Sequence, residues 1–174
     1  MKVVFLAIGS EQLGISQLAA IVKNKGYEID LVFTASLFHD RFNLEIPWLN
    51  KFFDETKSVI QEIIDKEPDV IAFGPLTATF QWSISIVREV KKIKPNIKTI
   101  FGGVHTSAVP EICLSYNEVD YAVVGEGENA ILDILNDIEQ GGLELPINNA
   151  QYIGKDGQII KGKQVGFHQE LDDF

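Results

Sequence analysis

Short apolar runs alternate with segments of helical period along this chain, and this alternation constrains the fold most. The runs are rich in Val, Ile and Phe, as expected for strands that are buried on both faces of a parallel sheet. Segments of helical period between such strands predict crossover helices. We therefore predict an α/β fold with a five-stranded parallel sheet and helices on both of its faces. The expected strands are 2–8, 29–33, 70–73, 98–101 and 121–124, and the expected helices are one around 15–22 that ends at Gly26, then 52–66, 80–94, 109–116 and 128–139.

The net charge of -10 on 174 residues limits the ligands that the chain can bind. A nucleic-acid partner requires a basic surface that displaces counterions, so we expect none. A phosphate-bearing ligand would have to be held mainly by backbone N–H groups, because the acidic chain offers no lysine cluster.

The lone cysteine, Cys113, cannot form an internal disulfide or a multi-thiolate metal site. It fits a reducing compartment, and we expect a cytoplasmic location. No apolar run approaches the ~18 residues of a membrane span, so no membrane partner is expected.

The C-terminal part differs in pattern from the rest. Two short strand-like runs flank Asp156-Gly157, which is a typical turn pair of a β-hairpin. The last residues, "GFHQELDDF", are polar and acidic and resemble an interdomain linker. We therefore divide the chain into a main domain (1–145), a hairpin extension (146–165) and the start of a linker (166–174).

Adjacent glycines, Gly102 and Gly103, follow the fourth expected strand. In an open parallel sheet, ligands bind beyond the carboxyl ends of the strands, so this pair lies on the expected ligand edge. It shares that edge with the predicted loops 9–14, 34–50, 74–79, 102–107 and 125–128. Glycines there allow positive φ and a close approach of a ligand to the backbone. A tight turn without a ligand is the alternative.

Three other patterns are weaker. "GEGENA", residues 125–130, matches the dinucleotide fingerprint, but it follows the fifth strand rather than the first, and its carboxylates would repel a pyrophosphate. The histidines, at 39, 105 and 168, lack metal-ligand spacing, so no metal site of protein ligands alone is expected. Trp48 and Trp82 are interpreted as packing residues.

Residues 71–131 resemble the N-terminal cobalamin-binding domain of cobalamin-dependent radical SAM enzymes, the group that includes the anaerobic magnesium-protoporphyrin IX monomethyl ester cyclase. The resemblance is carried by "KPNIKTIFGG", by "GG-x-H" followed by "PE", and by "VDYAVVGEGE", in this order and spacing. It implies a flavodoxin-like (Rossmann-like) sheet that holds cobalamin across its carboxyl edge.

The resemblance also implies where cobalamin would be bound. The cofactor's nucleotide tail would pass the loops after the third, fourth and fifth strands, and the loop 11–14 would pack beneath the corrin. For His105, a polar contact at the mouth of the cleft and a helix-entry role stay open. The residues expected at the cofactor are Glu11, Gln12, Leu13, Gly14, Pro75, Leu76, Thr77, Thr79, Gly102, Gly103, His105, Gly125, Glu126 and Gly127.

Two departures refine this expectation. Cobalamin domains of methyltransferases and mutases carry D-x-H-x-x-G after the first strand, where this chain has "GSEQLG", with Gly9 and Glu11 in place of the aspartate and the ligand histidine. We therefore predict base-off binding without a histidine ligand. One cysteine also cannot supply the C-x-x-x-C-x-x-C cluster motif, so the iron–sulfur cluster and S-adenosylmethionine would belong to a catalytic domain of the same polypeptide beyond these residues.

Two alternatives remain beside a cobalamin-binding module of a radical SAM methyltransferase or oxidative cyclase. The domain could be a degenerate relative that only mediates interactions. It could also be an unrelated flavin- or nucleotide-binding α/β protein.

Overall fold

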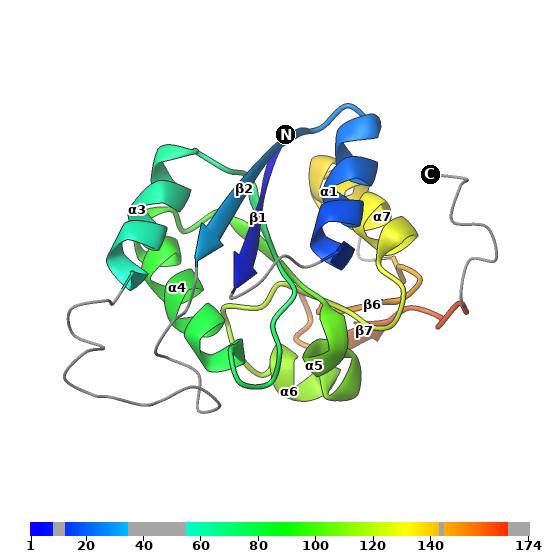
Figure 1. Ribbon diagram of the computed structural model, residues 1–174. Helices are drawn as coiled ribbons and strands as arrows, with labels where there is room; N and C mark the ends of the chain where they lie inside the picture. The colour runs from blue at the N-terminus through cyan, green and yellow to red at the C-terminus, as the bar shows by residue number, and fades with distance from the viewer. Residues whose placement is uncertain (9–12, 35–54, 143–144, 167–174) are drawn as a thin grey trace.

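A computed structural model describes residues 1–8, 13–34, 55–142 and 145–166, and its centre is a single sheet flanked by helices (Figure 1). The strands are β1 (Lys2–Ile8), β2 (Glu28–Thr34), β3 (Val70–Phe73), β4 (Lys98–Phe101), β5 (Tyr121–Val123), β6 (Ala150–Ile153) and β7 (Ile159–Lys161). The helices are α1 (Leu13–Asn24), α3 (Thr56–Asp65), α4 (Phe80–Ile93), α5 (Gly103–Ala108), α6 (Pro110–Leu114) and α7 (Glu128–Glu139).

The strand order is β2-β1-β3-β4-β5-β6-β7. Strands β1 to β5 pair in parallel in the order 2-1-3-4-5, which is the flavodoxin-like order. The connections after β1 and β3 leave in opposite directions along the sheet, so the strand order reverses between these two neighbours. The predicted α/β fold with five parallel strands is therefore confirmed.

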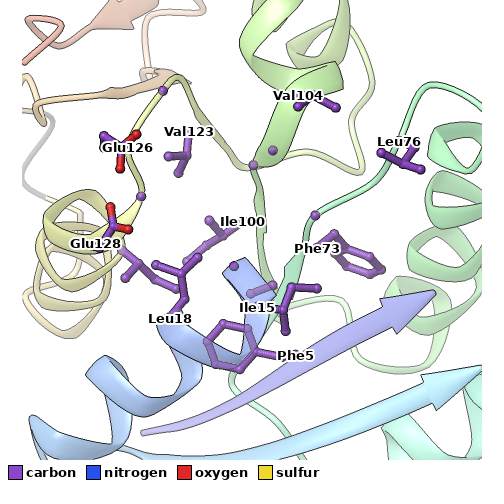
Figure 2. A pocket seen from close by; sticks show the side chains of 18 of the residues that line it. Phe5, Ile15, Leu18, Phe73, Leu76, Ile100, Val104, Val123, Glu126 and Glu128 are labelled. Atoms are coloured by element: carbon purple, nitrogen blue, oxygen red, sulfur yellow. The ribbon is translucent and has the colours of Figure 1, made fainter. Parts of the chain in front are cut away.

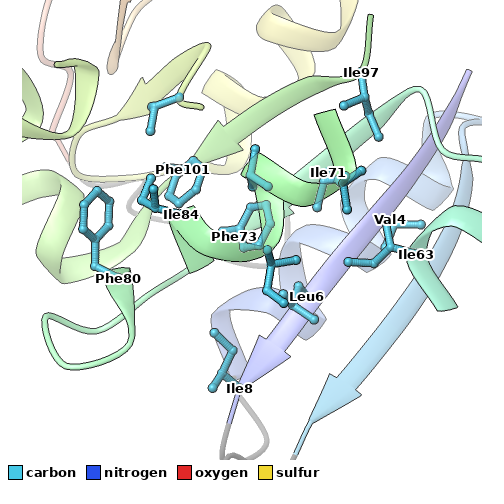
Figure 3. Close-up of a cluster of buried hydrophobic side chains, with 14 of the residues drawn as sticks. Val4, Leu6, Ile8, Ile63, Ile71, Phe73, Phe80, Ile84, Ile97 and Phe101 are labelled. Carbon is cyan, nitrogen blue, oxygen red and sulfur yellow. The ribbon is translucent and has the colours of Figure 1, made fainter. Parts of the chain in front are cut away.

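The two faces of the sheet carry separate apolar layers. On one face, α3, α4 and α6 cover a cluster that includes the stacked rings of Phe73 and Phe101, with centroids 4.7 Å apart (Figure 3). On the other face, α1 and α7 pack on alternate residues of the same strands, such as Phe5 and Ile100. Successive strand side chains point to opposite faces, so continuous apolar runs are needed to fill both layers.

The predicted C-terminal hairpin is present and continues the main sheet. Strands β6 and β7 form, but β6 pairs antiparallel with β5, so both strands extend the main sheet. The aromatic side chains of Tyr121 and Tyr152 explain this, because they face each other across the β5–β6 pair and bury an apolar edge that β5 would otherwise expose.

The predicted loop 102–107 is wrong in part, since residues 103–108 form the short helix α5. Six residues with two β-branched side chains and a leading glycine give no measurable helical period. The helix stops at Val109, because the residue before a proline disfavours helical backbone, and Pro110 then starts α6.

Smaller differences are confined to element ends, and part of the prediction lies outside the described residues. That part comprises the ligand-edge residues 9–12, including Glu11 and Gln12, most of the loop 34–50, the first residues of the helix 52–66, Trp48, two of the three histidines, and the linker from residue 167. Among the described residues, none of the helices combines the length and hydropathy that a membrane crossing requires.

Candidate functional site

A cavity of about 470 Å³ opens at the carboxyl edge of the sheet. It lies on the face covered by α1 and α7, and its floor consists of strand residues that alternate toward that face, among them Phe5, Ala72 and Ile100. Ile15 and Leu18 of α1 close one side (Figure 2). Ile131 of α7 also lines the cleft. The cavity is therefore an apolar cleft beside the point where the strand order reverses, where open α/β sheets bind ligands.

Glycines leave the upper walls of this cleft as bare backbone. Gly102 has extended backbone, whereas Gly103 has a φ of 80° at the start of α5, and Gly125 has a φ of 82°. A Cβ on Gly103 would lie 3.6 Å from the Cα of Gly74, and one on Gly127 would lie 3.4 Å from a methyl group of Leu18. Both distances are ordinary van der Waals contacts, so the positive φ of Gly103 and Gly125, rather than crowding, is what favours glycine in these walls.

Two carboxylates, Glu126 and Glu128, are the only charged side chains among the described residues that line the cleft. They lie together on its α7 side (Figure 2). Partial burial, the charge of Glu128 and a hydrogen bond with Glu128 raise the pKa of Glu126 above its ordinary value. No described Lys or Arg side chain lines the cleft, so a ligand phosphate there would have to be held by backbone N–H groups, and the two carboxylates suit ligand groups that donate hydrogen bonds.

His105 lies outside the cleft lining, at the junction of two loops beside the opening. Its Nδ1 is 3.1 Å from the hydroxyl oxygen of Thr77, and its ring lies 4.5 Å from the ring of Phe80, centroid to centroid. Burial lowers the pKa of His105, which favours the neutral imidazole. His105 thus makes a polar contact beside the mouth of the cleft and also lies in the first turn of α5, so both roles left open for it remain predictions.

Three large apolar side chains around the opening are exposed. Leu13 is 81% exposed, Val104 68% and Leu76 56%, and they come from α1, α5 and the loop after β3. Leu76 and Val104 line the opening opposite the carboxylates (Figure 2). Exposed apolar side chains that converge on one opening are typical of a ligand or partner surface.

The structure brings about half of the predicted site residues into one cleft. The lining includes Gly14, Leu76, Gly102, Gly103, Gly125, Glu126 and Gly127. Leu13 stands exposed beside it, and Pro75, Thr77, Thr79 and His105 support its edge without lining it. Thr79 illustrates this support, because its hydroxyl oxygen accepts from the N–H of Leu76 at 3.1 Å and fixes the turn that carries Leu76.

Sequence reasoning missed the floor and sides of the cleft. The missed lining residues are Phe5, Ile8, Ile15, Leu18, Ala72, Phe73, Gly74, Ile100, Val104, Val123 and Ile131. Strand alternation could have found some of them, since the last residues of each strand that face α1 and α7 must meet at this edge. The lining residues on the helices could be identified only from the observed packing of α1 against the sheet.

A family model of the B12 binding domain matches residues 6–135, which include the whole cleft except Phe5. The chain belongs to the B12-binding domain family. The end of β1, the strands β2 to β5, α1 and most of α7 fall within the matched range, whereas the hairpin β6–β7 follows it.

This B12-binding domain is similar to a much longer curated protein. It is 23% identical over 150 residues to the anaerobic magnesium-protoporphyrin IX monomethyl ester cyclase of Rubrivivax gelatinosus, a match that covers 84% of this chain and 24% of the cyclase. The chain thus spans about a quarter of the length of this relative.

Two solved structures share the fold. The cobalamin-dependent S-adenosylmethionine radical enzyme OxsB, solved with aqua-cobalamin and S-adenosylmethionine bound, superposes with a TM-score of 0.70 at 14% identity, over 95% of this chain and 22% of OxsB. The radical S-adenosylmethionine methyltransferase TsrM from Kitasatospora setae superposes with a TM-score of 0.69 at 13% identity, over 92% of this chain and 30% of TsrM. The B12-binding domain is therefore similar to the corresponding domains of cobalamin-dependent radical SAM enzymes.

The described part of the chain contains no group of three or more His, Cys, Asp and Glu side chains that could hold a metal ion. This B12-binding domain therefore offers a cleft for a bulky organic ligand, and its described residues offer no metal centre of their own.

Proposed function

We propose that this chain is the cobalamin-binding module of a radical SAM methyltransferase or oxidative cyclase. The observation that carries the proposal is the apolar, glycine-walled cleft at the strand-order reversal of a B12-binding domain. A flat ring system and an uncharged, amide-fringed macrocycle suit this lining. The glycines leave room for it, and the burial of the apolar floor is favourable. When bound, cobalamin would supply the organometallic chemistry of methyl or radical transfer.

The residues present fit the cofactor in distinct roles. The glycine loops 102–103 and 125–127 would let the nucleotide tail run against backbone, and the aliphatic floor would bury its base. Leu76 and Val104, exposed at the mouth, would pack against the corrin, together with Leu13 and the rest of the loop 11–14. Pro75, Thr77 and Thr79 would hold the loop that carries Leu76.

We further propose that cobalamin is held base-off without a histidine ligand. His105 supports this, because it is the one histidine in the described residues and its ring is engaged by Thr77 and Phe80 outside the cleft lining. The "GSEQLG" segment supports it from the sequence, since Glu11 stands where related domains carry their ligand histidine.

The catalytic partner in this proposal is a radical SAM domain on the same polypeptide, joined through the linker from residue 166. An iron–sulfur cluster and S-adenosylmethionine would be bound there, and the assembly would work in the cytoplasm, as the single cysteine suggests. A C-x-x-x-C-x-x-C motif in the reading frame beyond Phe174 is expected. If the reading frame lacks this motif, the proposed enzyme class is wrong, but the proposed binding of cobalamin in the cleft is unaffected.

The decisive experiment is the retention of hydroxocobalamin through gel filtration, followed by the corrin absorption bands. Gly102→Leu should abolish retention, because extended backbone at this position tolerates a side chain that would project beside Val123 into the cleft. Val104→Asp should weaken it from the exposed rim.

Lys57→Leu on α3, on the opposite face of the sheet, adds the same side chain to an exposed site and should retain cobalamin as the natural chain does. If neither the natural chain nor the complete polypeptide retains cobalamin, the proposal fails. An interaction-only role or a flavin or nucleotide ligand would then be tested by partner capture and thermal shift.

A further inference from the structure

Asn149, between the loop 145–148 and β6, makes hydrogen bonds to three separate segments. It is buried and has a φ of 56°, a left-handed backbone that asparagine adopts more readily than most residues. Its carbonyl oxygen accepts from the N–H of Val124 at 2.8 Å, at the end of β5, and its own N–H donates to the carbonyl oxygen of Lys163 at 3.0 Å, beyond β7. The main chain of Asn149 thus bridges the end of β5 and the segment that leaves the sheet.

The side chain of Asn149 repeats this bridge. Its Nδ2 donates to the carbonyl oxygen of Glu126 at 3.1 Å and to that of Val165 at 3.2 Å, and its Oδ1 accepts from the N–H of Val165 at 2.7 Å. The amide therefore pairs with the backbone of Val165 on both sides, as a neighbouring strand residue would. Both protons of the amide and its oxygen are engaged, so each bond depends on the position of the others.

The bond to Glu126 connects this bridge to the cleft. Residues 125–128 form the loop that lines the α7 side of the opening, and its other anchors are the bond from the Gly125 N–H to the Ser107 hydroxyl at 3.0 Å and the bond from the Ile131 N–H to the Gly127 carbonyl at 2.8 Å. Asn149 is the described side chain that joins this loop to the segment 163–165. A displacement of that segment therefore acts, through the Asn149 side chain, on the bond to the Glu126 carbonyl.

We propose that Asn149 is a positioning residue that couples the segment 163–165 to the cleft loop 125–127, so that the placement of this outgoing segment sets the shape of the cleft. Asparagine suits the position because aspartate would lack the donor for Glu126 and glycine would lack the side chain. The coupling itself concerns this chain's own backbone. Only its consequence for cofactor affinity rests on the proposed cobalamin function.

The test is amide hydrogen exchange by NMR on the whole 174-residue chain. Val165→Pro removes the N–H that Asn149 Oδ1 accepts and changes no atom of the cleft loop. The amide protons of Gly125 and Ile131 should then exchange roughly fivefold faster, the ratio expected for the loss of about one net hydrogen bond. In an Asn149→Gly background, which keeps the left-handed backbone, Val165→Pro should add nothing further.

Asn149→Asp separates coupling from simple anchoring. The carboxylate can still accept from the Val165 N–H, but it cannot donate to the Glu126 carbonyl. The Gly125 amide should therefore exchange faster while the Val165 amide remains protected. Asp156→Ala, which removes a 2.9 Å side chain–backbone bond in the hairpin turn, is the matched control and should change neither amide.

Unchanged exchange at Gly125 in Val165→Pro would overturn the proposal, and so would an effect that persists in Asn149→Gly. As a second measurement, the dissociation constant for hydroxocobalamin should rise by roughly fivefold in Val165→Pro, in proportion to the same lost bond. If the natural chain does not bind hydroxocobalamin, the proposed function fails while the exchange data still decide the coupling.

Discussion

His105 and Thr77 join α5 to the loop that follows β3, with the imidazole Nδ1 3.1 Å from the threonine hydroxyl oxygen. Their chain neighbours Leu76 and Val104 carry the exposed apolar side chains at the mouth of the cleft. The contact between His105 and Thr77 therefore fixes the distance between the walls that carry Leu76 and Val104, although neither His105 nor Thr77 lines the cleft.

The stability of the protein should depend on the protonation of His105. Burial lowers its pKa in the folded state below the ordinary value of 6.5, so the unfolded chain binds the proton more readily. The stabilising neutral form is fully present above pH 6.5 and is lost as the pH falls through the window between this value and the lower folded pKa. Urea unfolding should show a smaller loss of stability between neutral and mildly acidic pH in His105→Gln than in the natural chain.

Thr77→Val is the matched control for that experiment. It removes the hydroxyl group but leaves the partly buried imidazole, so the acid-dependent loss should remain. Equal pH profiles for His105→Gln and the natural chain would contradict the assignment.

Two glycines of the cleft should respond to alanine with opposite signs. Gly103 has a φ of 80°, where a Cβ is strained, so Gly103→Ala should cost about 1–2 kcal/mol of unfolding free energy. Gly14 lies inside α1 with no atom within 4 Å of a Cβ built there, so Gly14→Ala should stabilise by about 0.5 kcal/mol. Urea denaturation of both variants measures the difference, and a stabilised Gly103→Ala would refute the strain.

The sequence predicted the sheet well because each parallel strand needs a continuous apolar run, as 70–73 and 98–101 illustrate. It did not predict α5, whose six residues are too short for a period. It also did not indicate Leu18 or Ile131 as cleft residues, because their position depends on how α1 and α7 sit on the sheet. The hydrogen bonds of Asn149 could not be predicted for a similar reason, since its partners Glu126 and Val165 lie 23 and 16 residues away.

Glu126→Gln should stabilise the protein at neutral pH. The pKa of Glu126 is raised in the folded state, so its contribution to stability is fully present below the ordinary value of 4.5 and is lost as the pH rises through the folded pKa. Glutamine cannot ionise and avoids the repulsion from Glu128. The melting temperature of Glu126→Gln should therefore exceed that of the natural chain at pH 7, and the two should converge at pH 4.

Glu89→Gln serves as the control, because it removes a carboxylate from an exposed pair with Lys92 on α4. An exposed pair contributes little, so no comparable rise is expected at pH 7. If the stability of Glu126→Gln falls relative to that of the natural chain between pH 4 and pH 7, the fold favours the ionised carboxylate and the prediction is wrong.

The last prediction concerns Gly162, where the segment leaving β7 crosses the backbone of Ile147. A Cβ on Gly162 would overlap the carbonyl group of Ile147, and this neighbour is backbone rather than a flexible side chain. Gly162→Ala should therefore cost about 3 kcal/mol or displace the hairpin, at the upper end of what overpacking costs. Gly166→Ala, four residues on in open space, should be neutral by the same urea titration. Because Gly162 precedes Lys163, which is bonded to Asn149, Gly162→Ala should also accelerate amide exchange at Gly125, whereas Gly166→Ala should leave it unchanged.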